Sequence, residues 1–182
     1  MSESRITLIR HAAPRVSTDE RIRGHHFGDW VARYEASDIV PPPQPLPHFP
    51  KVYCSTLLRA QQTAALLSDH VVADSRLVEA PVPALSLAPL RGKARHFVIL
   101  ARLLWLLGLH REVESAAKAK TRAEHVADWL AARAGEEGEV VVVAHGFINH
   151  LIGKALQRRG WQAASDQTSS HHLGQTEFCL TR

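Results

Sequence analysis

Two histidines and two arginines from distant parts of the sequence stand at or near the ends of three apolar runs: Arg10, His11, Arg59 and His145. Ligands of open α/β sheets bind beyond the carboxyl ends of the strands, where such side chains would meet. Arginine is a planar, always-charged donor that suits two-point contacts with phosphate, and histidine is a nucleophile or acid/base near neutral pH. The set predicts phosphate chemistry without a metal, in which the arginines supply the positive charge that Mg²⁺ supplies in kinases.

The three apolar runs predict the strands that would bring these side chains together. They cover residues 6–9, 52–54 and 140–144. The last, Val140–Ala144, is a continuous valine run ending in alanine, as expected of a parallel strand buried on both faces. Ser55 follows the second run, and we expect it to cap the N-terminus of a helix that continues to Ser68 and carries Arg59.

Helical spacing of apolar residues alternates with the strands. Predicted helices cover residues 29–37, 55–68, 95–109, 112–134 and 147–159, and further strands cover 71–72 and 176–180, the last at the edge of the sheet. This alternation predicts an α/β fold: a three-layer sandwich with a mostly parallel central sheet and helices on both faces. The length of 182 residues predicts one domain, residues 1–182.

Proline content marks one irregular segment. Six prolines lie between residues 41 and 50. Proline fixes φ and lacks an N–H donor, so neither a helix nor a central strand is expected there. We predict an extended connection on the surface rather than a linker between domains.

Charge and apolar patterning narrow the classes of partner. The formal net charge is +4, without a block of like charges, which predicts no nucleic-acid partner and suits a small anionic substrate. The most apolar segment, residues 97–109, is too short to span a bilayer, so we expect no membrane partner. We expect this segment to form a helix packed in the core rather than in a dimer interface, although the oligomeric state stays open.

The N-terminus and the cysteines predict a cytoplasmic protein. The first residues lead straight into a strand-like run and lack the long apolar region of a signal peptide. Cys54 and Cys179 match no zinc spacing and are expected to be reduced thiols. The adjacent pairs His25-His26 and His171-His172 have no metal-binding spacing either, so we predict no metal site.

Four stretches resemble the histidine phosphatase superfamily, which includes the cofactor-dependent phosphoglycerate mutases. Leu8-Ile9-Arg10-His11-Ala12 is similar to its strand ending in Arg-His-Gly, and Val141-Val142-Val143-Ala144-His145-Gly146 to the strand that carries the second histidine. Tyr53-Cys54-Ser55-Thr56-Leu57-Leu58-Arg59-Ala60-Gln61-Gln62-Thr63-Ala64 is similar to its Ser-Pro-Leu-x-Arg-Ala-x-Gln-Thr-Ala stretch, and Leu77-Val78-Glu79 to its Leu-x-Glu. The four occur in the order of the family.

The resemblance implies a role for each matched residue. His11 is similar to the residue that becomes phosphorylated, and Glu79 to the proton donor. Arg10, Arg59 and His145 are similar to the phosphate pocket, with His145 also counted as catalytic. From the residues alone Glu79 could equally be an ordinary loop carboxylate, and the competing candidates for the acid are Asp29 and Asp74.

Departures from the family pattern bear on the reaction. Ala12 replaces the usual glycine, Thr56 replaces a proline, and Ala80-Pro81-Val82-Pro83 stands where a Gly-x-x-Glu-Gly element is usual. The Ser-x-x-Asn element of true mutases is missing after His11. The missing mutase element, the short chain and the proline-rich loop favour hydrolysis over mutase chemistry.

The resemblance implies metal-independent hydrolysis of a phosphomonoester through a phosphohistidine on His11, with no cofactor. Two alternatives stay open: phosphoglycerate mutase-type phosphoryl transfer, and a non-catalytic module that binds a phosphorylated ligand. The expected partner is a small phosphorylated substrate or a phosphoprotein. Residues 14–50 and 80–111, which would select it, match no family pattern closely, and Arg95 and Arg102 within them are interpreted as a polar helical stripe.

Overall fold

The computed structural model describes residues 3–109, 113–167 and 171–181, and its centre is a six-stranded sheet. From one edge to the other, the strands are β4 (Val71–Asp74), β3 (Val52–Ser55), β6 (Glu139–Ala144), β1 (Glu3–Arg10), β8 (Gln175–Thr181) and β7 (Gln162–Gln167). The first four are parallel to one another, whereas β8 runs antiparallel to both β1 and β7. The predicted mostly parallel sheet is confirmed.

The far edge of the sheet differs from the prediction. Residues 176–180 were expected at the edge, but β8 lies between β1 and β7. The strand β7 escaped prediction because its sequence, Gln-Ala-Ala-Ser-Asp-Gln, has neither an apolar run nor β-branched residues.

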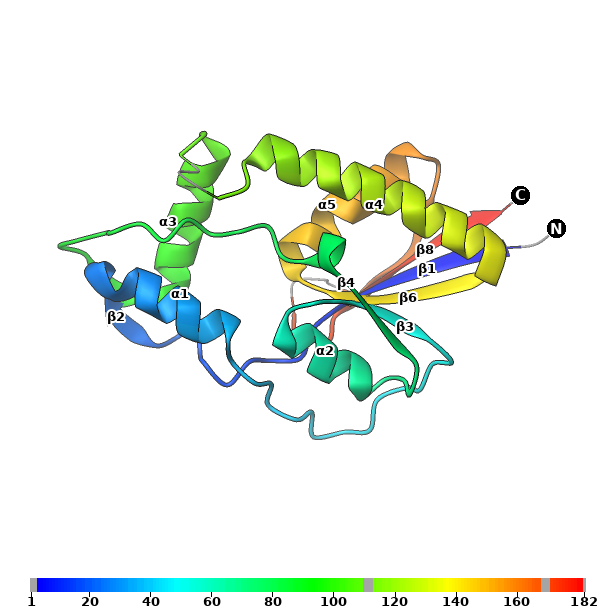
Figure 1. Ribbon diagram of the computed structural model, residues 1–182, viewed down its shortest axis with the longest axis horizontal. Helices are drawn as coiled ribbons and strands as arrows, with labels where there is room; N and C mark the ends of the chain where they lie inside the picture. Colours follow the sequence, from blue (N-terminus) through cyan, green and yellow to red (C-terminus); the bar gives the residue numbers. More distant parts are fainter. Residues whose placement is uncertain (1–2, 110–112, 168–170, 182) are drawn as a thin grey trace.

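Helices cover both faces of the sheet (Figure 1). They are α4 (Ala116–Glu137) and α5 (Gly146–Arg158) on one face and α2 (Leu58–Ala65) on the other. The N-cap of α4 is Ser115, whose Oγ accepts a hydrogen bond from the N–H of Lys118, so this helix begins after the predicted Glu112, which lies outside the described residues. The helix continues past the predicted end at Ala134 to Glu137, and Gly138, with φ of 79°, follows as its C-cap.

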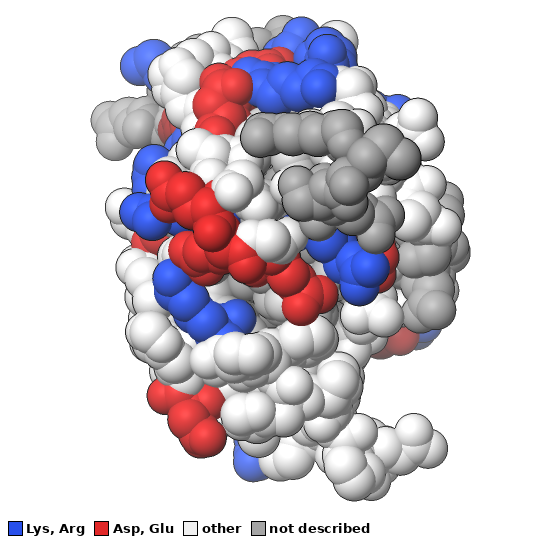
Figure 2. Space-filling model, turned by 90° about the vertical axis from the view of Figure 1, so that its right-hand side faces the viewer, with Lys and Arg blue, Asp and Glu red and all other residues white. Residues whose placement is uncertain are grey.

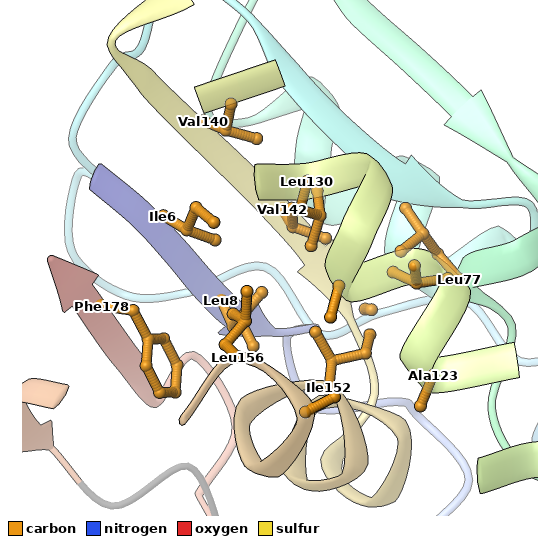
Figure 3. Close-up of a cluster of buried hydrophobic side chains, with 14 of the residues drawn as sticks. Ile6, Leu8, Leu77, Ala123, Leu130, Val140, Val142, Ile152, Leu156 and Phe178 are labelled. Carbon is orange, nitrogen blue, oxygen red and sulfur yellow. The ribbon is translucent and has the colours of Figure 1, made fainter. Parts of the chain in front are cut away.

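The alternation of side chains along β1 and β6 builds two cores. Ile6, Leu8, Val140 and Val142 face α4 and α5, where they pack against the side chains of Leu130, Ile152 and Leu156 (Figure 3). Ile9, Val141 and Val143 face the opposite way and pack with α2. Burial on both faces explains the unbroken valine run of β6.

A smaller unit lies beyond the carboxyl ends of the parallel strands (Figure 1). We call it the cap. It consists of residues 21–35, with β2 (Arg21–Arg23), a 3-10 turn (Gly24–His26) and α1 (Phe27–Glu35), and of residues 80–106, with β5 (Arg91–Lys93) and α3 (Ala94–Leu106). Its two strands pair with each other, and Phe27, Trp30 and Phe97 are buried where α1 meets α3. The helices predicted near 29–37 and 95–109 are therefore confirmed.

The helix α3 was expected to be buried, but only one of its faces is. Phe97, Ala101 and Trp105 are buried, but Ile99 and Leu103 on the opposite face are 57% and 53% exposed. The remaining exposed apolar side chains near the end of this helix are Leu106, Leu107 and Leu109. The prediction of core packing was wrong for this face, because periodicity alone does not reveal which face of a helix the chain covers, and among the described residues this one is left exposed.

The face near the two termini carries acidic and basic side chains close to one another (Figure 2). Residues 41–50 form no helix or strand, and most of them are exposed, as predicted. Among the described residues, no helix is both long and apolar enough to cross a membrane.

Candidate active site

His11 lies directly after β1 and is 2% exposed. Its backbone N–H continues the sheet by donating to the carbonyl oxygen of Ala144 at 3.0 Å. The ring Nδ1 lies 2.7 Å from the carbonyl oxygen of Ala12, which can only accept, so Nδ1 carries the proton. The lone pair is consequently on Nε2, which accepts a hydrogen bond from Nε of Arg59 at 3.2 Å.

The pKa of His11 is lowered to about 3. Burial is the largest cause, since it disfavours the charged ring, and the positive charges of Arg59 and Arg10 act in the same direction. The hydrogen bond to Ala12 opposes them. Desolvation is therefore a stronger cause of the neutral state than the neighbouring arginines. His11 is a neutral imidazole at physiological pH.

Arg59 is held from several sides near the start of α2. It is 3% exposed, and burial lowers its pKa from the usual arginine value. Its guanidinium lies 5.2 Å from the ring centre of Tyr34, and Nη1 donates to the carbonyl oxygen of Glu35 at 3.4 Å. Tyr34 and Glu35 belong to α1, so the cap helps to hold the side chain of Arg59, which α2 carries.

Thr63 ties α2 to the end of β1. Its hydroxyl donates to the carbonyl oxygen of Arg59 at 2.7 Å and accepts from the N–H of Ala12 at 2.9 Å. This side chain therefore sets the spacing between the residue after His11 and the helical turn that carries Arg59. Thr63 lies within the stretch from Tyr53 to Ala64 that resembles the family, but the resemblance assigns it no role.

His145 follows β6 and is fully buried, with its ring centre 5.0 Å from that of His11. Its Nε2 lies 2.9 Å from Oγ of Ser55, whereas its buried Nδ1 has no hydrogen-bond partner among the described residues. The pKa of His145 is well below the usual value, first because of burial and then because of the charge of Arg59. A neutral ring whose Nε2 accepts from Ser55 would present Nδ1–H as a donor.

Ser55 corrects a prediction. It was expected to be the N-cap of the following helix, but it is the last residue of β3, and α2 begins at Leu58 after Leu57. Its hydroxyl accepts from the N–H of Leu57 at 3.2 Å and contacts His145. A serine before a helix signals a cap from sequence alone, and only the packing of β3 beside β6 reveals the histidine contact.

Glu79 is fixed at the N-terminus of α5. Its Oε1 accepts from the N–H groups of Ile148 and Ala80, both at 2.9 Å, and its Oε2 accepts from Phe147 at 3.2 Å. A carboxylate at a helix N-terminus satisfies otherwise unpaired N–H groups and interacts favourably with the helix dipole. Both the local chain and α5 therefore determine where this carboxyl group points.

The two competing carboxylates lie elsewhere. Asp29 is exposed on α1, 3.4 Å from Nδ1 of His26. Asp74 accepts hydrogen bonds from Arg76, which lower its pKa. Neither lines a cavity with His11, whereas Glu79 does.

A cavity of about 160 Å³ brings the five predicted site residues towards one space. Arg10, His11, Arg59 and Glu79 line it, and the ring centre of His145 is 5.0 Å from that of His11. The cap completes the wall, chiefly with Trp30, Val31, Tyr34, Val82, Val98 and Arg102. Among the described residues, no three His, Cys, Asp or Glu side chains are placed to hold a metal ion.

The family model of the histidine phosphatase superfamily (branch 1) matches residues 45–178, more than half of the chain. The chain belongs to this superfamily. The match includes Arg59, Glu79 and His145 but not Arg10 and His11, which the sheet brings to the same cavity. Among curated proteins, none matches the chain in sequence.

Several solved structures share the fold. A mycobacterial glucosyl-3-phosphoglycerate phosphatase is 20% identical, with a TM-score of 0.58, over 97% of this chain and 90% of that one. A structure described as mycobacterial hydrolase 1 is 18% identical, with a TM-score of 0.57, over 97% and 92%. A phosphoserine phosphatase variant from Entamoeba histolytica, in complex with phosphoserine, is 14% identical, with a TM-score of 0.53, over 95% and 89%.

Sequence reasoning missed the cap's share of the site. Arg102 was interpreted as part of a polar stripe, but it lines the cavity and donates to the carbonyl oxygens of Ala80 and Pro81 at 2.8 and 3.0 Å. Arg95 is instead paired with Asp19 on the surface. None of the four stretches that resemble the family includes α1 or α3, so only the fold could separate the two arginines.

Proposed function

We propose that this chain is a phosphomonoester hydrolase that acts through a phosphohistidine on His11, without a metal ion or other cofactor. One observation carries the proposal: a buried, neutral imidazole has the lone pair of Nε2 beside a buried arginine, with a second neutral histidine 5.0 Å away between ring centres. A binding module would need the cations but not the nucleophile. Membership of the histidine phosphatase superfamily supports the same reaction class.

In the first step, Nε2 of His11 attacks the phosphorus atom in line with the leaving oxygen. A phosphate oxygen accepts the N–H of Arg59, which otherwise donates to Nε2, so binding frees the lone pair. Arg10, Arg59 and Nδ1–H of His145 offset charge on the equatorial oxygens. The P–O bond to the leaving group breaks as the P–N bond forms.

Glu79 supplies the proton in this proposal. Protonated, it donates to the departing oxygen, so that the product leaves as an alcohol. In the second step a water attacks phosphorus, its proton passes to the carboxylate of Glu79, and the P–N bond breaks. His11 regains its lone pair, and inorganic phosphate leaves.

The proposed substrate is a small phosphomonoester. The cavity is lined by both the sheet edge and the cap, which supports treating residues 1–182 as one catalytic domain. The neighbours named as glucosyl-3-phosphoglycerate phosphatase and phosphoserine phosphatase are consistent with a small phosphorylated substrate.

Acid-quench labelling tests the proposal directly. The chain is mixed with ³²P-labelled p-nitrophenyl phosphate, quenched within milliseconds, and divided between acid and alkali. We expect protein-bound label that is lost in acid and kept in alkali, as for a phosphoramidate. The His11→Ala variant should carry none, whereas His25→Ala, which removes an exposed histidine of the cap, should carry as much as the parent chain.

Three results would contradict the proposal. Label that persists in His11→Ala would place the intermediate on another residue. Isomerisation of phosphoglycerate without release of phosphate would establish a mutase. Tight binding of phosphate esters with neither label nor phosphate release would establish a binding module.

A further inference from the structure

A second, larger cavity adjoins the phosphate site. It has a volume of about 490 Å³ and runs between α3 and α5, whereas the cavity that contains His11 has about 160 Å³. Ligand pockets usually measure roughly 300–1,000 Å³, so the first space suits a phosphoryl group and the atoms next to it, and the second suits the rest of a substrate. Arg10 and Glu79 line both spaces, so one molecule could occupy them together.

The polar side chains of this groove already have partners within the chain. Glu79 accepts three backbone hydrogen bonds. Arg102 donates to two carbonyl oxygens, and its guanidinium carbon lies 4.4 Å from the ring centre of Phe147. Arg10, the other cation that lines the groove, is half-buried and holds the phosphate in the proposed reaction, so a charged leaving group would have to compete with these contacts. Among the residues that line the groove, His150 is the exposed polar side chain.

The remaining wall is apolar. Val98, Ile99 and Leu103 of α3 face Phe147 of α5 across the groove. Ile99 and Leu103 are more than half exposed, and nothing in the described chain covers them. Contiguous exposed apolar surface next to a polar site marks a place where an apolar ligand group is buried.

We propose that the substrate is the phosphomonoester of an apolar alcohol, whose hydrocarbon part lies in the groove between α3 and α5. This inference rests on the proposed function, because it places the phosphate at Arg10, His11 and Arg59. It predicts poor use of substrates that carry further charge, such as phosphoserine or 3-phosphoglycerate.

A chain-length series measures the groove. In ethyl, butyl and hexyl phosphate the leaving alkoxides have nearly the same basicity, so differences in kcat/KM report binding of the alkyl chain. A fully buried methylene contributes about 0.8 kcal/mol, which is about fourfold in a rate or binding constant. In a groove open on one side, we expect kcat/KM to rise about two- to fourfold per methylene and hexyl phosphate to exceed phosphoserine by at least about tenfold. A flat or falling series would overturn the proposal.

Matched variants locate the effect on α3. Leu103→Gln puts a polar group into the wall, and the gain per methylene should fall by about half, whereas Leu103→Met should keep it. Leu107→Gln changes a side chain that directly follows the same helix, is 84% exposed and does not line the groove, and it should leave the series unchanged. Equal loss in Leu103→Gln and Leu107→Gln would mean that the dependence on chain length is unspecific.

Binding of alkylphosphonates separates this inference from the proposed reaction, because phosphonates bind without turnover. Calorimetry on the parent chain should show hexylphosphonate binding more tightly than ethylphosphonate by the same factor per methylene. If that holds but no phosphoenzyme forms, the groove is right and the proposed reaction is wrong. If the phosphoenzyme forms but affinity does not depend on chain length, the groove assignment is wrong. A dimer that Leu103→Gln dissociates, with no dependence on chain length, would assign this face to a second copy of the chain.

Discussion

The sheet and the cap are stabilised by hydrophobic cores of different depth. The sheet buries both faces of β1 and β6 under three helices, so that Leu8 and Val142 are almost inaccessible. The cap has one small core between α1 and α3, and the outer face of α3 is exposed. Side chains in a deep core have few alternative positions, whereas a thin layer of packing opens at lower free energy.

The sheet and the cap also contribute different kinds of side chain to the site. His11, Arg59 and His145 follow or lie near sheet strands, and hydrogen bonds to the sheet or to α2 fix their positions. The cap contributes mainly apolar walls such as Trp30 and Val98. We therefore expect changes at the sheet edge to affect the reaction with every substrate, and changes in the cap to affect substrate choice and local stability.

Glu79, at the boundary between the two regions, gives the largest expected effect. General acid catalysis contributes about 10²–10⁴-fold, so Glu79→Gln should lower kcat on alkyl phosphates by about that factor. With p-nitrophenyl phosphate, whose leaving group departs unaided, formation of the phosphoenzyme should fall far less. Hydrolysis of the phosphoenzyme should also slow, because in the proposed reaction the same carboxylate takes the proton of the attacking water. Rapid-quench kinetics on both substrates would measure the contrast.

The competing carboxylates are the controls for that prediction. Asp29→Asn and Asp74→Asn change carboxylates that do not line the cavity, so each should keep nearly the parent rates. Small and equal losses on both substrates in Glu79→Gln would remove Glu79 from the mechanism. A large loss in Asp29→Asn or Asp74→Asn would move the role there.

The same two regions differ in how well their sequences predict them. Val140–Ala144 is apolar throughout because both of its faces are buried, so the strand and the position of His145 could be predicted. The contact of Ser55 with His145 could not, because it joins neighbouring strands that are distant in sequence. In the cap, the apolar spacing predicts that α3 is a helix but not which of its faces the chain covers. Arg102 and Arg95, on the same helix, have opposite surroundings that only the fold reveals.

A matched pair of glycines tests the thinner core of the cap. Gly24 is buried, and a Cβ there would overlap the carbonyl oxygen of Leu87, so Gly24→Ala must push residues 80–106 away from the 3-10 turn. We expect this crowding to lower the free energy of unfolding by about 1–3 kcal/mol. Hydrogen exchange should rise first in the cap and not in β1 or β6. Faster exchange throughout the sheet as well would mean that the two regions open as one unit.

Gly28 is the control in the same region. A Cβ at this helical position would be 3.5 Å from Cβ of Ala84, an ordinary contact. Alanine is a better helix former than glycine by up to about 1 kcal/mol, so Gly28→Ala should leave stability unchanged or raise it slightly. Urea unfolding of both variants measures the difference between them.

The last expected effect is the dependence of stability on pH, which should come from the sheet edge rather than from the cap. The pKa of His11 is about 3 in the folded chain, against an ordinary value of 6.5. Between these values the unfolded chain binds a proton that the folded chain does not, so acid favours unfolding. The contribution of His11 to the free energy of unfolding is complete above pH 6.5 and is lost as the pH falls towards 3. The loss is at most about 1.4 kcal/mol per pH unit for this group.

The slope of stability against pH, rather than stability itself, isolates this contribution. Urea unfolding between pH 7 and pH 5 avoids the range in which Asp74 and Glu137 titrate, because the pKa values of both carboxyl groups are lowered. His11→Gln removes the titrating ring and should reduce the slope, even where it also changes stability at pH 7. The matched variant His25→Gln lies in the cap, where the ring is exposed, and it should keep the parent slope. If both variants keep that slope, the pKa of His11 is the same in the folded chain as in the unfolded chain. Burial then does not hold the ring neutral for the proposed attack on phosphorus.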